Sequence, residues 1–275
     1  MKHLKLLLVC VSACVMTLGA KDPHIKPTLC RPDLCPHSQN HLGCLSNNTF
    51  GKKCGDNNYI INVNGGLRLS ILDRINVMRN YIASGAGHLP AAARMPTMGW
   101  DTNLQRLADL QARQCDENGW FCANMDKYHY VATTETKVMV SWRTVIHQVI
   151  LVGLLPELFL DALGCKMGTE YRLEPIKQGS CVGHYVPLIE DHGDRMGCAL
   201  RLKTDKNTTR EDRTVVLHLI CHFSRSNVNR QKHYEEAKDP TSKCVTGPNH
   251  LYPYLCSTDE VVDANEIMEE PADSP

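Results

Sequence analysis

The sequence lacks a net charge, because its 30 Lys and Arg residues are balanced by 30 Asp and Glu residues. Proteins that attract nucleic acid or anionic membranes carry an excess of positive charge. The balance therefore gives no reason to expect either partner, and it says nothing about neutral ligands. An internal repeat is missing as well.

The sequence also lacks an apolar run long enough to cross a membrane. A transmembrane helix needs about 20 apolar residues, whereas the N-terminal run covers only residues 6–18, between a basic start and Gly19-Ala20. This pattern predicts a signal peptide over residues 1–20, cleaved after Ala20. A second apolar segment, Val145 to Leu163, contains a proline and two acidic residues, so we predict a buried helix or pair of helices there.

What the sequence does contain is 14 cysteines, of which Cys10 and Cys14 leave with the signal peptide. An even number of cysteines in an exported chain favours complete pairing in disulfides. Metal binding is the alternative, because Cys30 and Cys35 are close enough in sequence to form a ligand pair, but they lack the tight spacing of a zinc knuckle. We predict disulfides at the 12 remaining positions, Cys30, Cys35, Cys44, Cys54, Cys115, Cys122, Cys165, Cys181, Cys198, Cys221, Cys244 and Cys256.

Two Asn-x-Thr acceptors, at Asn47 and Asn207, agree with export and predict N-glycosylation on surface loops. The roughly 255 residues left after cleavage are enough for one sizeable core with cysteine-rich margins. The expected setting is extracellular.

The order of patterns along the chain predicts an α+β layer fold. A cysteine-rich arm covers residues 21–65. The main domain, residues 66–230, begins with helical periodicity from Leu67 to Ile82 with Ser70 as a possible N-cap, then from Trp100 to Cys115 and from Val138 to Val152. Strand-like runs follow at residues 185–189, 196–202 and 214–222.

Two segments complete the chain. Residues 231–256 form a cysteine-containing extension, and residues 257–275 contain seven acidic residues without Lys or Arg. This composition predicts an acidic flexible tail.

Several landmarks occur in an order that identifies a family. They are the helix Ile71–Gly85, Trp100-Asp101-x-x-Leu104 through Cys115, Gly183-His184-Tyr185, Met196-Gly197-Cys198-Ala199-Leu200, Cys221-His222-Phe223-Ser224, and Ser242-Lys243-Cys244 with Tyr252-Pro253-x-Leu255-Cys256-Ser257. Together they resemble the CAP superfamily of cysteine-rich secretory, antigen 5 and pathogenesis-related proteins. The last landmark resembles the insect antigen 5 branch.

The resemblance implies an α-β-α sandwich with a disulfide-rich N-terminal arm and a C-terminal extension. It also implies the disulfides Cys30–Cys44, Cys35–Cys122, Cys54–Cys115 and Cys198–Cys221. That leaves Cys165 with Cys181 and Cys244 with Cys256.

The cleft of this family holds two histidines and two acidic residues that bind a divalent metal in some members, but the pattern is degenerate here. The second histidine is retained as His184, whereas Gly119 stands where the resemblance places the first. Residues 149–155, where the last acid is expected, are apolar throughout. A single histidine forms neither a strong metal site nor a nucleophile–base pair, so we predict no metal, no cofactor and no catalytic residue.

We therefore predict a secreted, non-enzymatic protein that binds an extracellular protein or a receptor. The resemblance implies saliva, venom, gut or male seminal fluid, the last with a role in reproduction. One alternative is carriage of a small apolar ligand such as a sterol or fatty acid on the Val149–Leu163 run, although that run is also typical of a buried core. Another is a metal-dependent hydrolase, which needs Glu135 or Asp116 to replace the lost ligands.

Overall fold

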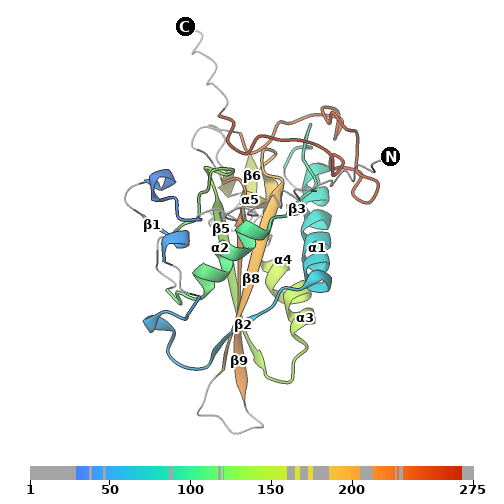
Figure 1. Cartoon of the computed structure of the whole chain (residues 1–275). Coiled ribbons are helices and arrows are strands. Elements are labelled where there is room, and N and C mark those ends of the chain that lie inside the picture. Colours follow the sequence, from blue (N-terminus) through green and yellow to red (C-terminus); the bar gives the residue numbers. More distant parts are fainter. Residues whose placement is uncertain are drawn as a thin grey trace, which may run out of the picture.

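The computed structural model describes residues 29–36, 39–45, 48–86, 89–116, 119, 121–159, 165–167, 173–175, 186–204, 213–226, 228 and 232–267. The expected signal peptide, both glycosylation acceptors, Cys181 and His184 therefore lie outside the described residues. Figure 1 shows a central sheet between helices, with the N-terminal arm and the C-terminal extension at its margins.

The sheet has four antiparallel strands in the order β2 (Asn58–Ile61), β8 (Arg195–Thr204), β9 (Thr214–Phe223) and β5 (Ala132–Ser141), and the short β3 (Gly99–Trp100) runs parallel to β8. Most side chains of β8 and β9 are buried on both faces, as expected for strands with a layer on each side. The strands predicted at residues 196–202 and 214–222 are confirmed.

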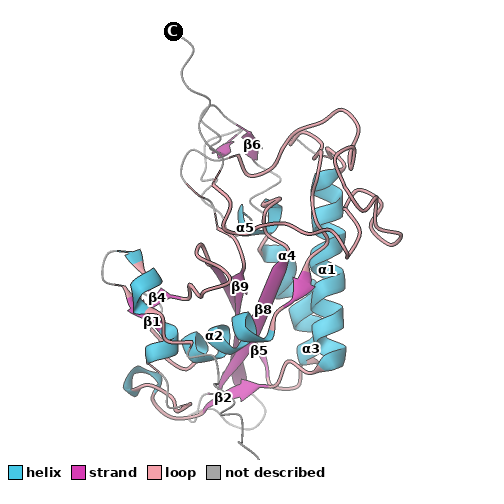
Figure 2. Cartoon of the chain, turned by 45° about the horizontal axis from the view of Figure 1, so that its top comes forward, coloured by secondary structure: helices cyan, strands magenta, loops and turns pink. Residues whose placement is uncertain are grey.

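Helices cover both faces of this sheet (Figure 2). On one face, α1 (Gly65–Ala83), α3 (Ile146–Gln148), the π-helical η5 (Val149–Leu154) and α4 (Leu155–Glu157) form the main core with the strands. On the other face, Ala108 and Ala112 of α2 (Thr102–Ala112) pack against Ala199 and Ile220. This arrangement is the expected α-β-α sandwich.

The long helices begin where a side chain satisfies free backbone N–H groups. Asp101 caps α2 by accepting hydrogen bonds from the N–H groups of Asn103 and Leu104, and Asn64 caps α1 by accepting from Leu67. The prediction of Ser70 as the first cap is wrong, since its hydroxyl lies inside α1 and donates to the carbonyl oxygen of Gly66.

Two other predictions of secondary structure are wrong. Residues 138–141, expected at the start of a helix, belong to β5, in which exposure alternates along a stretch rich in threonine and valine. Helical structure begins only at Ile146. Residues 186–189, expected as a strand, form the short helix α5 (Val186–Ile189).

The N-terminal arm consists of short elements, η1 (Pro32–Leu34), β1 (Asn40–His41), η3 (Leu42–Cys44) and η4 (Lys52–Cys54). β1 pairs in parallel with β4 (Phe121–Cys122), and β6 (Cys165–Met167) pairs with β7 (Leu173–Pro175). Five disulfides lie among the described residues and join the cysteines that the resemblance and the remaining count imply: Cys30–Cys44, Cys35–Cys122, Cys54–Cys115, Cys198–Cys221 and Cys244–Cys256. The expected Cys165–Cys181 pair includes a residue outside the described ranges.

The C-terminal extension packs against the sandwich well beyond Cys256. Glu260 and Ala264 are buried, and the carbonyl oxygen of Ala264 accepts a hydrogen bond from Arg225. The side chain of Asn265 bonds to the backbone of residues 127 and 129. The prediction of a flexible tail is therefore wrong for residues 257–267, whereas residues 268–275 lie outside the described part of the chain.

The apolar segment that begins at Val145 belongs to the core. Ile150, Leu154, Leu155 and Leu158 are almost completely buried between α1 and the sheet, which agrees with the prediction of buried helices. Within the described ranges, no helix has the length and apolar composition needed to cross a membrane.

Candidate functional site

The position where the resemblance places the first histidine, Gly119, lies against the aromatic ring of Phe121. A Cβ atom at Gly119 would lie 2.4 Å from Cε2 and 2.7 Å from Cζ of Phe121. Both distances are shorter than van der Waals contact, so a histidine here would have to displace the aromatic ring. The aromatic ring of Phe121 therefore occupies the space beside Gly119. The second histidine, His184, lies outside the described residues.

The two acids that were candidates to replace the lost ligands both have partners. Oε2 of Glu135 lies 2.6 Å from Nε2 of His218, whose Nδ1 lies 3.1 Å from Nη2 of Arg201. A guanidinium only donates hydrogen bonds, so Nδ1 accepts and Nε2 donates to Glu135. Asp116 forms an ion pair with Lys53. Neither carboxylate is free to hold a metal ion in this arrangement.

The position expected for the last acid of the cleft is filled by core side chains. Ile150, Leu154 and Leu155 contribute to the main hydrophobic core. A carboxylate among them would lose its hydration without an obvious compensating partner. The apolar sequence of residues 149–155 thus serves packing.

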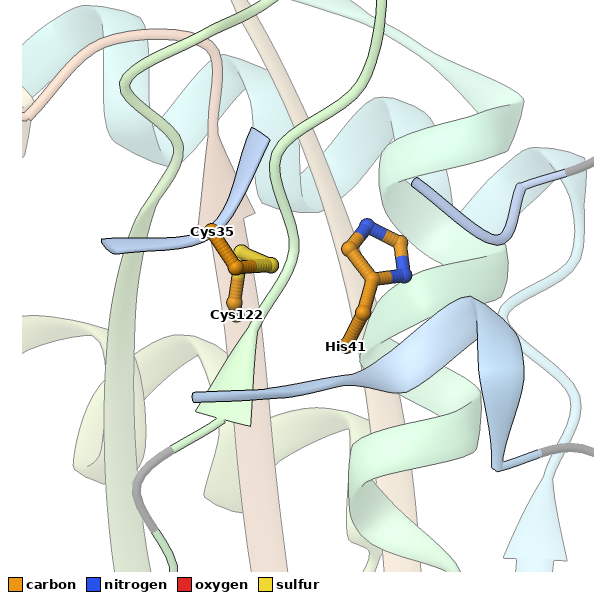
Figure 3. A group of neighbouring side chains, drawn as sticks. All are labelled: Cys35, His41 and Cys122. Atoms are coloured by element: carbon orange, nitrogen blue, oxygen red, sulfur yellow. A yellow bond between two sulfur atoms is a disulfide. The ribbon is translucent and has the colours of Figure 1, made fainter. Parts of the chain in front are cut away.

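Cys35, His41 and Cys122 are the one group of three potential metal ligands found within the described ranges (Figure 3). The two sulfur atoms are bonded to each other, and metal coordination by cysteine needs a free thiolate. Nδ1 of His41 accepts a hydrogen bond from the Gly43 N–H at 3.0 Å, and Nε2 donates to the carbonyl oxygen of Asn124 at 2.6 Å. The group therefore joins the N-terminal arm to the body and is not a metal site.

A cluster of buried charged groups lies where α1, α5 and the C-terminal extension meet. The guanidinium of Arg79 donates to four backbone carbonyl oxygens, three of them in residues 188–193. Burial lowers the pKa of Arg79 to about 10, despite the nearby carboxylates. Glu190 lies 2.7 Å from Nδ1 of His233, and burial raises the pKa of the Glu190 carboxyl. These groups hold segments together and leave no open reactive centre.

Two other histidines have pKa values shifted in opposite directions because their surroundings differ. His222 lies under α2 with Nε2 2.8 Å from Oε1 of Gln111, and burial lowers the pKa of His222 to about 3. His192 lies 2.7 Å from a carboxylate oxygen of Asp191 and 3.4 Å from one of Glu266. The contact with Asp191 raises the pKa of His192. His222 is therefore a neutral part of the core, and His192 is part of an acidic contact with the extension.

Among the described residues, the three most exposed large apolar side chains lie on or beside the C-terminal loop, which we define as Cys244–Cys256. Val245 is 85% exposed, Leu251 is 81% exposed, and the neighbouring Val261 is 82% exposed. The N–H of Val245 contacts the Glu260 carboxylate, next to Val261 in the chain. Three highly exposed apolar side chains on and beside one loop make this segment a candidate binding site.

The C-terminal loop is fixed in shape despite its exposure. The disulfide closes it, and the Cys256 N–H donates to the carbonyl oxygen of Met95 at 2.8 Å. Inside the loop, the Asn249 side chain accepts from the N–H groups of Leu251 and Tyr252 and donates to Thr97. A rigid surface loses little conformational entropy when it binds a partner.

Sequence reasoning missed the C-terminal loop as a candidate site. A signal was present, since residues 244–256 contain no Asp, Glu, Lys or Arg. Depletion of charge is typical of the centre of protein–protein interfaces. The same composition is common in buried segments, so exposure had to be seen in the structure.

These observations define a disulfide-stapled α-β-α sandwich in which residues 149–155 belong to the core and the ring of Phe121 lies against Gly119. Residues 72–223, more than half of the sequence, match the family described as "CAP: Cysteine-rich secretory protein family", and the chain belongs to this family.

Curated relatives place it in the insect antigen 5-like branch. The chain is 25% identical over 233 residues to Venom allergen-1 of Aedes aegypti, covering 85% of this chain and 88% of the relative. It is 28% identical over 235 residues to Tabinhibitin 3 of Tabanus yao, covering 84% and 87%. It is 27% identical over 187 residues to the Antigen 5 like allergen Cul n 1 of Culicoides nubeculosus, covering 64% and 84%.

Solved structures show the same fold. The crystal structure of Na-ASP-1 matches with a TM-score of 0.52 and 18% identity, covering 76% of this chain and 50% of that one. The crystal structure of NaASP2 with Zn2+ matches with a TM-score of 0.50 and 19% identity, covering 77% and 99%. At these identities the likeness concerns the fold alone.

Proposed function

We propose that the protein is secreted and non-enzymatic, and that it acts by binding another extracellular protein or a receptor. Disulfides persist in oxidising extracellular compartments, and the predicted signal peptide agrees with that setting. The name of one relative, Venom allergen-1, agrees with a secreted fluid as the setting. The filled cleft supports a role without catalysis.

The observation that carries this proposal is the exposed apolar surface of the rigid C-terminal loop. Val245, Leu251 and Val261 stay in water although each would gain about 1.5–3 kcal/mol from full burial. Burying these side chains against a complementary protein surface would provide this free energy. The entropic cost of binding would be low because the loop is already rigid. The lack of charged residues in the loop favours an apolar pocket on the partner.

The test compares affinity capture from the native fluid by the wild-type protein and by a triple variant, Val245→Ser, Leu251→Ser and Val261→Ser. Met139→Ser is the matched control, because Met139 is an exposed apolar residue of β5 and not part of the C-terminal loop. We expect wild type and Met139→Ser to retain the same partner and the triple variant to lose at least nine tenths of it. Equal recovery by all three proteins would show that the loop does not carry the binding.

Carriage of a small apolar ligand is the second candidate, and one groove favours it. A groove of about 540 Å³ lies between α1 and η5, with Leu69, Leu151 and Val152 among its walls. Its volume is within the range of small-molecule sites. Mass spectrometry of an organic extract of the purified protein tests this candidate, and the absence of stoichiometric lipid would remove it.

A metal-dependent hydrolase has less support, because Glu135 and Asp116 are engaged with His218 and Lys53. A metal that binds only the folded protein raises its melting temperature. We expect zinc to leave the melting temperature unchanged, and a saturable rise would revive this candidate.

A further inference from the structure

One end of the molecule exposes apolar side chains from separate segments. Leu69 near the start of α1, Val145 between β5 and α3, and Val152 in η5 are each more than half exposed. Trp142, directly after β5, is exposed as well. We call these four side chains the apolar tip. Figure 1 shows the end of β5 and α3 at the lower end of the molecule, whereas the C-terminal extension lies at the upper end.

Contacts in the fold hold these segments together. Nε2 of His147 in α3 lies 3.2 Å from the hydroxyl of Ser70, the neighbour of Leu69 in α1. Leu69 and Val152 line the same groove, and Val145 directly precedes α3. The apolar tip is therefore one surface of the folded protein, although its residues are up to 83 positions apart in the chain.

The exposed charges beside the apolar tip are positive. Residues 136–156 contain two basic residues and no Asp or Glu. Arg143 is exposed, and its Cζ lies 5.7 Å from the ring centre of Trp142. Arg213, which directly precedes β9, is also exposed, and its carbonyl oxygen accepts from the Trp142 N–H at 3.0 Å. The zero net charge of the whole sequence therefore does not describe this end of the protein.

Two acidic residues on the adjoining elements are engaged elsewhere. Glu135 of β5 lies 2.6 Å from His218 of β9. Asp73 of α1 accepts a hydrogen bond from the hydroxyl of Tyr252 at 2.7 Å. The contacts of both carboxylates are with other elements and leave the two arginines to solvent.

We propose that this end of the protein docks on a phospholipid bilayer with an anionic surface. The aliphatic side chains of the apolar tip enter the edge of the hydrocarbon layer, and the Trp142 ring lies at the level of the headgroups, where Trp is enriched. Arg143 and Arg213 pair with lipid phosphate and carboxylate groups. The protein is held on the surface without crossing it. This docking goes beyond the protein binding proposed above, which uses the C-terminal loop.

The combination of apolar and basic groups selects an anionic bilayer over other partners. A sulfated polysaccharide would pair with the arginines but would leave the apolar tip in water. A neutral bilayer would accept the apolar side chains but would gain little from the arginines. A protein partner would need a surface shaped to fit side chains from several segments, whereas a fluid bilayer adapts to them.

Flotation of the full-length glycosylated protein with lipid vesicles tests the proposal. Glycosylation is kept because the predicted acceptor Asn207 lies in the sequence between β8 and β9. We expect binding to vesicles of phosphatidylcholine mixed with phosphatidylserine to be at least tenfold tighter than binding to phosphatidylcholine alone, and to weaken as salt is added.

Two double variants separate the charged from the apolar contribution. Arg143→Gln with Arg213→Gln should weaken binding to the mixed vesicles at least tenfold, and so should Trp142→Ser with Val145→Ser. Neither Trp142 nor Val145 lines the groove considered for an apolar ligand. The matched controls are Arg106→Gln, at an exposed arginine of α2, and Val245→Ser with Leu251→Ser on the C-terminal loop. Both controls should bind as wild type does.

Tryptophan fluorescence gives a readout on the wild-type protein itself. Lipids brominated on their acyl chains should quench part of the wild-type emission, and Trp142→Phe should lose this quenching because Trp100 is held in the fold by Gln105. Equal binding to both kinds of vesicle, quenching that persists in Trp142→Phe, or binding to heparin without binding to vesicles would overturn the proposal. Because the C-terminal loop contributes nothing to the apolar tip, this failure would leave the protein-binding function untouched.

Discussion

Removing the charge of Glu260 tests how the C-terminal segment is held. The carboxylate lies 2.6 Å from Nε of Arg94 and accepts hydrogen bonds from the N–H and hydroxyl of Thr246 at 2.9 and 2.7 Å. Burial alone would raise the pKa of this carboxyl. The hydrogen bonds from Thr246 and Arg94 outweigh burial and lower the pKa of Glu260 from 4.5 to about 2.

The difference between these pKa values corresponds to at most about 3 kcal/mol of unfolding free energy at neutral pH, and solvent screening reduces this to about 1–2 kcal/mol. Because the pKa is lower in the folded state, this stabilisation is complete well above pH 4.5 and disappears as the pH falls through about 2. Glu260→Gln should therefore lower the free energy of unfolding by about 1–2 kcal/mol at pH 7. The difference from wild type should shrink progressively between about pH 5 and pH 2.

Chemical denaturation followed by tryptophan fluorescence, repeated from pH 7 to pH 2, measures this difference. Glu266→Gln is the control, since the Glu266 side chain is 55% exposed and its loss should cost about 0.5 kcal/mol or less. A Glu260→Gln effect that is the same at pH 7 and pH 3 would refute the electrostatic account. An effect at pH 7 no larger than the control would refute the anchoring role itself.

Three further predictions concern the cleft, the loop and the histidines. Gly119→His should destabilise the protein by about 1–3 kcal/mol through contact with Phe121, and zinc should not restore its melting temperature. Replacing Cys244 and Cys256 together by Ala should cost about 3 kcal/mol in chemical denaturation, the expectation for a closed loop of this length. In an NMR titration His222 should stay neutral down to about pH 4, whereas His192 should gain its proton above pH 6.5; the reverse order would contradict the burial of His222.

Local patterns predicted the parts of the fold in which neighbouring residues decide the outcome. The periodicity of Leu104, Leu107 and Ala108 predicted α2, and those residues are buried as expected. The apolar stretch that includes Val138 and Val140 was read with a helical period, but their partners are Leu217 and Val215 on β9, more than seventy residues away. Pairing over that distance leaves no mark in a single sequence.

The cleft and the C-terminal segment show the same division between what nearby residues decide and what distant residues decide. The sequence predicted a degenerate cleft, because Gly119 stands where the resemblance places a histidine. The packing of residues 257–267 could not be predicted from the sequence, since the burial of Glu260 depends on Arg94, which is 166 residues away. Seven acidic residues without a basic residue nearby in the sequence are typical of a solvated tail. Arg94 comes close to Glu260 only when the chain is folded.

The covalent arrangement of the C-terminal loop has a consequence for how this protein can change. Its disulfide joins the two ends of the same short segment, whereas Cys35–Cys122 and Cys54–Cys115 connect the arm to the body. Most loop side chains point to solvent, so a substitution among them leaves the sandwich packing intact. Natural variation can therefore change the shape and chemistry of this exposed segment while the scaffold stays constant.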